Sequence, residues 1–309
     1  MTSVPLTQEI GSPRTGADTP AMAWDVLAPA EQTMPLVLAS PHSGTHYPAE
    51  FLALSRLDRS SLRRSEDSFV DELFGAAPAL GAPLLRARFA RAYIDANREP
   101  FELDSEMFID PLPDYINHES PRVAAGLGTI ARVAAGGSEI YRAKLRFSDA
   151  LQRIETLYRP YHAALRALVD RTREKFGFCI LLDCHSMPTT RAPSRTGEER
   201  AETDIVLGDC FGLSCAPVVT ALAHDTFTAA GLTVSRNRPY AGGFTTRHYG
   251  QPGLGVHALQ IEVSRALYMC ERTLRRGAQL GALAERMAEV VAALGRIEGR
   301  ALAPRPSQP

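Results

Sequence analysis

The sequence predicts a three-layer α/β fold, in which helices cover both faces of a central sheet. Two short runs, LVLA at 36–39 and CILL at 179–182, are apolar at successive positions. Such runs are typical of strands that are buried on both faces. From Leu151 to Leu168 the apolar residues instead recur at steps of three and four, which indicates one face of a helix. Strands that alternate with helices along the chain predict the three-layer arrangement.

Strands are expected where short apolar runs are bounded by polar or turn residues. The ranges are 35–40, 83–89, 92–95, 178–183, 204–207 and 257–263. Helices are expected over about 65–80, from Leu151 to the residue before Gly177, and over about 271–296. Pro160 lies inside the second helix and predicts a kink or a break there, because proline removes a backbone hydrogen bond.

Composition and charge argue against several classes of function. The 309 residues carry a net charge of −1, with 45% hydrophobic and 22% charged residues, which offers no positive footprint for nucleic acid or an anionic membrane. No apolar run approaches the roughly 20 residues that span a bilayer, and the N-terminus lacks the segments of a secretory signal. The five cysteines contain no CxxC pair, which favours reduced thiols. We therefore expect a cytoplasmic protein with no nucleic acid and no membrane partner.

The chain is expected to form a single α/β domain over residues 25–300. Residues 1–24 are rich in Thr, Ser, Pro and Gly without apolar periodicity and predict a flexible leader. Residues 301–309 predict a flexible tail, and no repeat or long linker divides the chain between these ends.

Polar residues follow three predicted strands at the edge where open α/β sheets bind ligands. His42 follows the strand at 35–40, His185 follows the strand at 178–183, and Glu262 lies near the end of 257–263. Neutral imidazole is the commonest zinc ligand, and catalytic zinc typically takes three protein ligands. The two histidines are therefore predicted metal ligands, although either one alone would favour an ordinary polar residue. A third ligand is sought in Glu66 or Asp67, at a predicted helix start where carboxylates also serve as caps.

Two further segments carry arginines that can bind a carboxylate. Asn97 and Arg98 follow the range 92–95, and a guanidinium beside an amide can grip a carboxylate with several hydrogen bonds. The glycine-flanked loop at 242–250 carries Arg247 and His248, with an ordinary surface turn as the alternative interpretation.

Competing motifs are weaker. GLGTIA at 126–131 has the form of a dinucleotide fingerprint, but no strand precedes it. The sequence contains no GxxxxGK[ST] or GxSxG motif. A nucleophilic role for Ser43, Ser186 or Cys184 beside its neighbouring histidine is disfavoured, because adjacent residues on an extended chain point apart.

Seven segments together resemble the N-formylglutamate amidohydrolase family, in the same order, over about residues 34 to 270. They are SPHSG (40–44), SEDSFVDELF (65–74), RAYIDANR (91–98), YRPYHAAL (158–165), LLDCHSMP (181–188), NRPYAGGFTTRHYGQP (237–252) and HALQIEVSRALYM (257–269). The resemblance implies an α/β/α sandwich with a mixed, largely parallel sheet of the phosphorylase/hydrolase-like type. It also implies one zinc ion and hydrolysis of N-formyl-L-glutamate to formate and L-glutamate in histidine degradation. The family is distantly similar to zinc carboxypeptidases and aspartoacylases.

The resemblance also implies roles for single residues. His42, Asp67 and His185 match the zinc ligands, with Glu66 as the reserve for the acidic position, because Thr45 stands where the HxxE spacing of carboxypeptidases has its glutamate. Glu262 matches the catalytic glutamate.

Asn97 and Arg98 match a pair that holds a substrate carboxylate. Formylglutamate has two carboxylates, so two positively charged side chains are expected to bind it. We expect these to be Arg98 and Arg247, with Arg91 and His248 as nearby alternatives. Arg98 or Arg247 is also expected to stabilise the oxyanion.

Three other functions remain open from the sequence. The first is a related zinc amidohydrolase that acts on another N-acyl amino acid. The second is a non-catalytic ligand-binding descendant of the fold, and the third is a serine or cysteine hydrolase.

Overall fold

The computed structural model describes residues 23–189, 203–299 and 302. Within these residues one seven-stranded sheet has the order β1-β3-β2-β4-β7-β5-β6. Its strands are β1 (Trp24–Leu27), β2 (Leu36–Ser40), β3 (Leu84–Ala87), β4 (Cys179–Met187), β5 (Ile205–Gly208), β6 (Val234–Arg236) and β7 (Val256–Ser264). Neighbouring strands run parallel except at the β1–β3 and β5–β7 pairs. The sheet is thus mixed and largely parallel, as expected.

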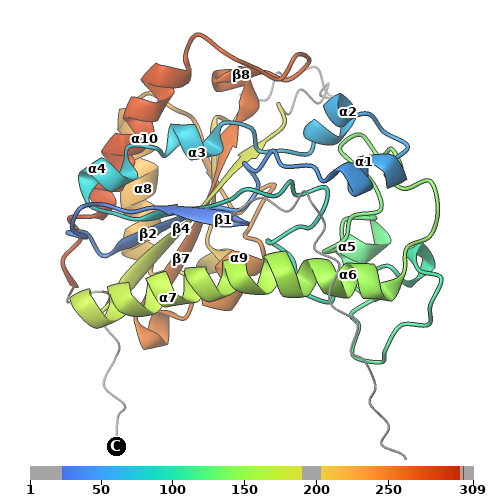
Figure 1. The fold of residues 1–309 in the computed structure, drawn as a ribbon. Helices are drawn as coiled ribbons and strands as arrows, with labels where there is room; N and C mark the ends of the chain where they lie inside the picture. Colours follow the sequence, from blue (N-terminus) through green and yellow to red (C-terminus); the bar gives the residue numbers. More distant parts are fainter. Residues whose placement is uncertain (1–22, 190–202, 300–301, 303–309) are drawn as a thin grey trace, which may run out of the picture.

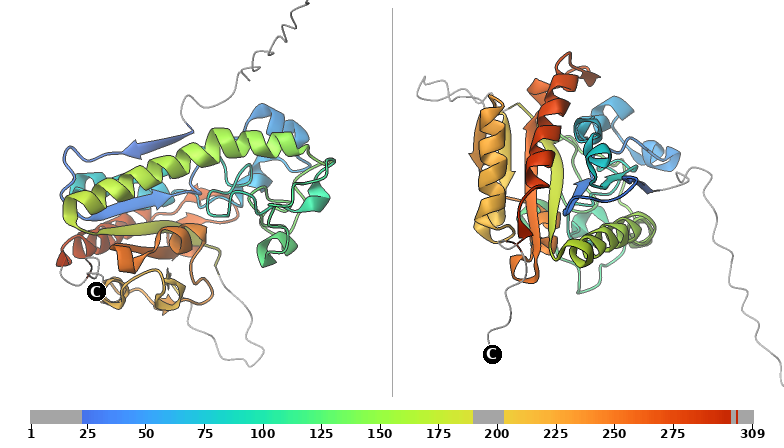
Figure 2. Two further views of the ribbon diagram at one scale, coloured as in Figure 1. Left: turned by 90° about the horizontal axis from the view of Figure 1, so that it is seen from below. Right: turned by 90° about the vertical axis from the view of Figure 1, so that its left-hand side faces the viewer.

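Helices cover both faces of the sheet, which confirms the three-layer prediction. Figure 2 (right) shows the sheet between α8 and α10 on one side and α7 on the other. One face packs against α7 (Arg159–Phe176) and α9 (Phe244–Tyr249), and the other against α3 (Val70–Leu73), α4 (Ala77–Leu80), α8 (Pro217–Ala229) and α10 (Leu280–Leu294).

The alternation of side chains along a strand explains why the central strands are apolar throughout. Val37 and Leu181 belong to the core beside α7, whereas Leu36 and Leu182 belong to the core on the opposite face. Because successive strand residues point to opposite faces, a strand covered on both faces must be apolar at every position.

Shorter elements complete the described chain. They are α1 (Ala49–Leu54), α2 (Arg59–Arg63), α5 (Pro121–Ala124), α6 (Phe147–Arg153), 3₁₀ turns at Ser105–Met107, Cys210–Gly212, Pro252–Leu254 and Arg265–Leu267, and the hairpin of β8 (Met269–Cys270) and β9 (Arg275–Arg276). Figure 1 shows α1, α2 and α5 grouped at one end of the long α6–α7 rod.

The predicted helix around Pro160 continues through the proline. A π-helical turn at Ile154–Tyr158 joins α6 to α7, and Figure 1 shows one continuous rod. The N–H of Arg159 donates to the carbonyl of Ile154, five residues back. This wider turn gives room to the proline ring, so the irregularity predicted at Pro160 takes the form of a π turn rather than a break.

Three predicted elements differ from the structure. Residues 92–95 form turns instead of a strand, and 65–80 contains only the short helices α3 and α4. Phe69, just before α3, has φ of +67°, a left-handed conformation that a continuous helix cannot contain. The first part of 271–296 forms part of the β8–β9 hairpin, so that α10 begins only at Leu280. In the two segments predicted as helices, turn propensity and tertiary pairing outweigh the helical signal.

The ends of the chain fall largely outside the described residues. Residues 1–22 of the predicted leader are among these, and β1 begins at Trp24. Of the predicted tail only Leu302 is described, and it is buried. In the described ranges, no helix is both long and apolar enough to cross a bilayer.

Candidate metal centre and its cavity

The face of β4 that packs toward α7 changes from apolar to polar along the strand. Cys179 and Leu181 belong to the core under α7, and the next residues on the same face are Asp183 and His185. All four side chains are buried. The strand therefore continues past its predicted end, and His185 lies within β4 rather than after it.

The neighbouring strand β7 shows the same change. Val256 and Ala258 belong to the core under α7, and Gln260 and Glu262 follow on the same face. In the parallel register of β4 and β7, His185 pairs directly with Glu262. Polar side chains from two strands thus form the floor of a site where the apolar cover of the sheet ends.

Three donor groups meet above this floor. The N–H of Asp67 donates to the carbonyl of His42 at 3.0 Å, which holds two distant segments together. Asp67 Oδ2 lies 3.2 Å from His42 Nδ1 and 3.0 Å from His185 Nδ1. These separations are close to the ligand–ligand distance of about 3.3 Å that follows from zinc bonds of about 2.0 Å in a tetrahedron. The buried group His42, Asp67 and His185 can therefore hold a metal ion.

A carboxylate lies behind each histidine. Asp95 Oδ1 is 2.7 Å from His42 Nε2, and Asp183 Oδ1 is 2.9 Å from His185 Nε2. Among the described residues, Asp183 Oδ1 is a buried atom that receives no well-directed hydrogen bond. A neutral His185 with its proton on Nε2 can donate to this oxygen and leaves the Nδ1 lone pair for a metal. The donor set of two imidazoles and one carboxylate therefore fits a metal at this position.

Burial and charge shift the protonation of the cluster. Burial acts to raise the pKa of Asp67, but hydrogen bonds from His185 and His42 outweigh it and hold the pKa well below its usual range. Burial acts to lower the pKa of His185, but the charge of Asp183 and further contacts raise it well above its usual value. Burial raises the pKa of Glu262 to about 7, against the lowering effect of His185. The two histidines and the carboxylates of Asp67, Asp183 and Glu262 thus form one electrostatically linked buried cluster.

Two arginines flank the acidic ligand candidate. Arg265 donates from one amino group to Asp67 Oδ1 at 3.1 Å and to the carbonyl of Glu66 at 2.7 Å. Arg91 Nη1 lies 3.8 Å from Asp67 Oδ1, and its Nη2 donates to Asp95 at 2.7 Å. Both arginines leave Asp67 Oδ2 free to face the histidines. The sequence reasoning did not single out Arg265, although it lies three residues after Glu262 in a quoted motif.

The reserve candidate Glu66 lies outside the donor cluster. Its carboxylate accepts hydrogen bonds from Tyr47 and Ser68 at 2.8 Å and from Arg63 at 3.1 Å. These contacts use the oxygens that a metal would need, so the structure brings Asp67 rather than Glu66 to the histidines.

A cavity of about 440 Å³ opens above the donor cluster. This volume lies in the range of small-molecule sites. Most of the predicted site residues line the cavity, namely His42, Asp67, Arg91, Asn97, Arg98, His185 and Glu262. Arg64, Asp95, Arg122, Tyr240, Gln260 and Arg265 also line it, and the sequence reasoning gave them no role. Alternation along β7 would have indicated Gln260, but no local pattern indicates the arginines.

Arg247 and His248 are not among the lining residues. Both are exposed on α9, where Arg247 Nη1 lies 3.5 Å from the carbonyl of Gly242 and His248 stacks on Phe244. The loop that precedes α9 does line the cavity, through Gly242 and Gly243.

Asn97 and Arg98 occupy different environments. The Asn97 amide accepts from the N–H of Thr245 at 2.8 Å and lies 2.9 Å from His185 Nε2, so its side chain joins α9 to the metal cluster. A Cβ on Gly243 would approach the Asn97 amide to 2.3 Å, so only glycine allows this contact. Arg98 donates to the carbonyls of Leu127 and Asn97 at 2.8 Å and retains further N–H groups toward the cavity.

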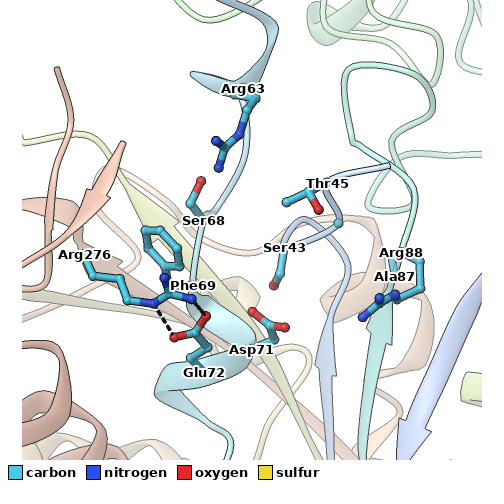
Figure 3. A pocket seen from close by; sticks show the side chains of 11 residues that line it. Ser43, Thr45, Arg63, Ser68, Phe69, Asp71, Glu72, Ala87, Arg88 and Arg276 are labelled. Carbon is cyan, nitrogen blue, oxygen red and sulfur yellow. Dashed lines mark hydrogen bonds and ion pairs between the residues drawn. The ribbon is translucent and has the colours of Figure 1, made fainter. Parts of the chain in front are cut away.

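A second pocket of about 220 Å³ lies next to the helix α3 (Figure 3). Its acidic side chains already have partners, since Glu72 binds Arg276 at 2.8 Å and Asp71 binds Arg86 at 2.9 Å. None of the three donor residues lines this pocket. The larger cavity is therefore the candidate site.

Comparisons with known proteins agree with this arrangement. An N-formylglutamate deformylase from Pseudomonas putida is 30% identical over 255 residues, which cover 80% of this chain and 86% of the relative. An N-formylglutamate amidohydrolase structure from Ralstonia eutropha JMP134 has a TM-score of 0.82 at 35% identity and covers 89% of this chain and 98% of that one. The gene product Atu2144 from Agrobacterium tumefaciens shares the fold, with a TM-score of 0.60 at 20% identity over 89% of this chain and 95% of that one.

The family model described as N-formylglutamate amidohydrolase matches residues 34–269, which is most of the chain and includes the whole donor cluster. The resemblance inferred from the sequence is thereby confirmed, and this chain belongs to the N-formylglutamate amidohydrolase family, whose members are hydrolases that act on an amide.

Proposed function

We propose that this chain is a zinc-dependent enzyme that hydrolyses N-formyl-L-glutamate to formate and L-glutamate. The observation that carries the proposal is the buried group of His42, Asp67 and His185 beside Glu262, in a cavity of small-molecule size. Family membership supports the substrate, because the relatives are named for this compound. A role in histidine degradation and a cytoplasmic location remain predictions.

His42, Asp67 and His185 would hold one zinc ion. When bound, zinc supplies a Lewis acid that polarises the formyl carbonyl and lowers the pKa of water to about 7. Asp95 and Asp183 orient the two imidazoles so that each Nδ1 faces Asp67. Such partners behind the ligands commonly strengthen metal binding.

Glu262 would serve as the general base and acid. It lies across from His185 in the strand pairing, and the Gln260 amide donates to its Oε1 at 2.8 Å, which leaves Oε2 for a water molecule. Glu262 takes a proton from the attacking water and delivers it to the amide nitrogen as the C–N bond breaks. The products are then formate and the free amine of glutamate.

Arginines would bind the negative groups of the substrate. The side chain of Arg91 is 22% exposed and lies within 4 Å of Asp67, so it suits the oxyanion that develops on the formyl oxygen. Arg98 would bind the α-carboxylate, because that group and the formylated nitrogen are attached to the same carbon. The predicted contributions of Arg247 and His248 stay predictions, because neither lines the cavity.

Metal content and formate release, measured together on the purified full chain, test the proposal. We expect about one zinc per chain, release of formate from N-formyl-L-glutamate, loss of activity with a chelator and recovery with zinc. A substrate panel of formyl, acetyl and formimidoyl compounds separates this activity from that of a related amidohydrolase. Chelator-resistant activity, or no formate from the zinc-loaded protein, would overturn the proposal.

A further inference from the structure

Arg122 is a cavity-lining arginine whose side chain makes no hydrogen bond or ion pair with the described residues. It belongs to α5 and is half-buried in the cavity wall. Within the ranges 23–189 and 203–299, no carboxylate, carbonyl or aromatic ring is in bonding contact with its guanidinium. Arg91, Arg98 and Arg265, by contrast, all bind acceptors of the protein. A guanidinium that is partly desolvated and unpaired gains free energy when an anion from solution binds it.

The backbone of Leu127 holds Arg122 beside Arg98. The N–H of Leu127 donates to the carbonyl of Arg122 at 2.7 Å, and the carbonyl of Leu127 accepts from Arg98 Nε at 2.8 Å. The two guanidinium groups therefore belong to one wall of the cavity. Burial lowers the pKa of Arg122, and the positive charges of Arg98 and Arg247 lower it further and outweigh the opposite effect of Glu102 and Asp95.

The order of the two arginines matches the order of charges on an acidic amino acid. Arg98 Nη2 lies 3.7 Å from Asp95, which in turn contacts His42, so Arg98 is tied to the metal cluster. Arg122 makes no contact within 4 Å with a carboxylate of the described residues, and Asp95 acts on it only at longer range. The side-chain carboxylate of a formylated glutamate lies two methylene groups beyond the α-carbon, farther from the scissile amide than the α-carboxylate.

We propose that Arg122 binds the side-chain carboxylate of an acidic N-formyl amino acid, next to the α-carboxylate on Arg98. The inference rests on the proposed function, and it assigns the preference for an acidic substrate to a residue of α5. Arg247, on α9, adds positive potential at Arg122 although it does not line the cavity. Arg64 also lines the cavity, and its side chain makes no hydrogen bond or ion pair with the described residues, but it is exposed and its charge stays hydrated.

The kinetic test compares N-formyl-L-glutamate with N-formyl-L-glutamine, which has nearly the same shape but no side-chain charge. We expect the wild-type protein to prefer the acidic substrate in kcat/KM by about 10- to 100-fold, the range of a charge-assisted hydrogen-bonded pair. Arg122→Gln should lose most of this preference through KM, and Arg122→Lys should keep part of it. Arg64→Gln is the matched control and should keep the preference, with thermal melting as the check that each variant is folded.

A binding measurement separates this inference from the proposed function. Glutarate carries two carboxylates and no amide, so calorimetric titration into the zinc-loaded protein reports the anion site without turnover. We expect binding of glutarate to weaken about tenfold or more in Arg122→Gln and to change little in Arg64→Gln. If no formyl substrate is hydrolysed but glutarate binding still depends on Arg122, the proposed reaction is contradicted and the anion site at Arg122 is not. Equal use of both formyl substrates by the wild-type protein, or an unchanged preference in Arg122→Gln, would overturn the role of Arg122.

Discussion

His185 and Glu262 are direct partners in the parallel pairing of β4 and β7, on the face of the sheet that α7 covers. The backbone register thus holds a metal-ligand candidate and a carboxylate side by side. Because register is set by the whole strand pair, their separation does not depend on a flexible loop. A general base beside a metal requires this kind of fixed separation.

Glu262→Gln should retain zinc and lose most turnover. The amide keeps the size and the contact with Gln260 but cannot accept the water proton, so we expect kcat to fall by about 10²- to 10⁴-fold. Metal analysis and formate release on the same preparation check this. Glu72→Gln, in the pocket of Figure 3, is the control and should leave both values unchanged. Near-normal turnover in Glu262→Gln would contradict the general-base role.

Asp67→Asn should bind zinc far more weakly, whereas Glu66→Gln should retain it. Of these two carboxylates, Asp67 lies within bonding reach of both histidines, while the Glu66 carboxylate binds Tyr47 and Arg63. Removal of a direct ligand should cost more than the 10- to 100-fold typical of an outer partner. Competition with a chromophoric chelator measures both affinities. Zinc lost from Glu66→Gln but kept by Asp67→Asn would reverse the assignment.

Asp183→Asn should weaken zinc binding by about 10- to 100-fold without unfolding the protein. Asp183 Oδ1 faces His185 Nε2 at 2.9 Å, and its charge favours the tautomer that exposes Nδ1. The same chelator competition measures the effect, with Asp71→Asn as the control outside the cavity. An unchanged zinc affinity in Asp183→Asn would show that it does not position His185.

Arg98→Ala should raise KM for N-formyl-L-glutamate by about 10- to 100-fold, because a charge-assisted pair with the α-carboxylate is lost. The α-amide of the same substrate lacks that charge and should be affected much less. Steady-state kinetics on both compounds, repeated for Arg247→Ala, compares the two arginines predicted to bind a carboxylate. We expect the smaller change for Arg247, which does not line the cavity. Equal KM changes on both compounds would contradict the role of Arg98.

The free energy of unfolding should fall as the pH falls below about 6.5, because the unfolded chain protonates His162 more readily than the folded chain does. Burial lowers the pKa of His162 to about 4, and its Nε2 lies 2.9 Å from the carbonyl of Ala96. Between these values the unfolded chain binds a proton that the folded chain does not. The penalty is therefore absent above pH 6.5, grows as pH falls toward 4, and reaches at most about 3 kcal/mol.

Urea unfolding at several pH values measures this effect. His162→Gln should flatten the loss of stability between pH 6.5 and 4, and His224→Gln, at a more exposed site on α8, is the control. The same pH dependence in the wild-type protein and in His162→Gln would contradict the prediction.

The central strands and the two histidines could be predicted because their signals are local. A strand covered on both faces must be apolar at each position, so β2, β4 and β7 are visible as short runs in the sequence. His42, His185 and Glu262 stand at or near the ends of these runs, and parallel strand ends bind ligands in such sheets. The ordered motifs then indicated the family, which the comparisons confirmed.

Only the tertiary structure decided which other groups join the site. Asp67 and Glu66 are neighbours in sequence, yet a hydrogen bond to the backbone of His42 brings one to the histidines, while Tyr47 and Arg63 bind the other. Arg122 reaches the cavity through a long connection whose path no periodicity indicates. Short-range sequence patterns report which residues are buried, but contacts between segments dozens of residues apart depend on how the whole chain packs.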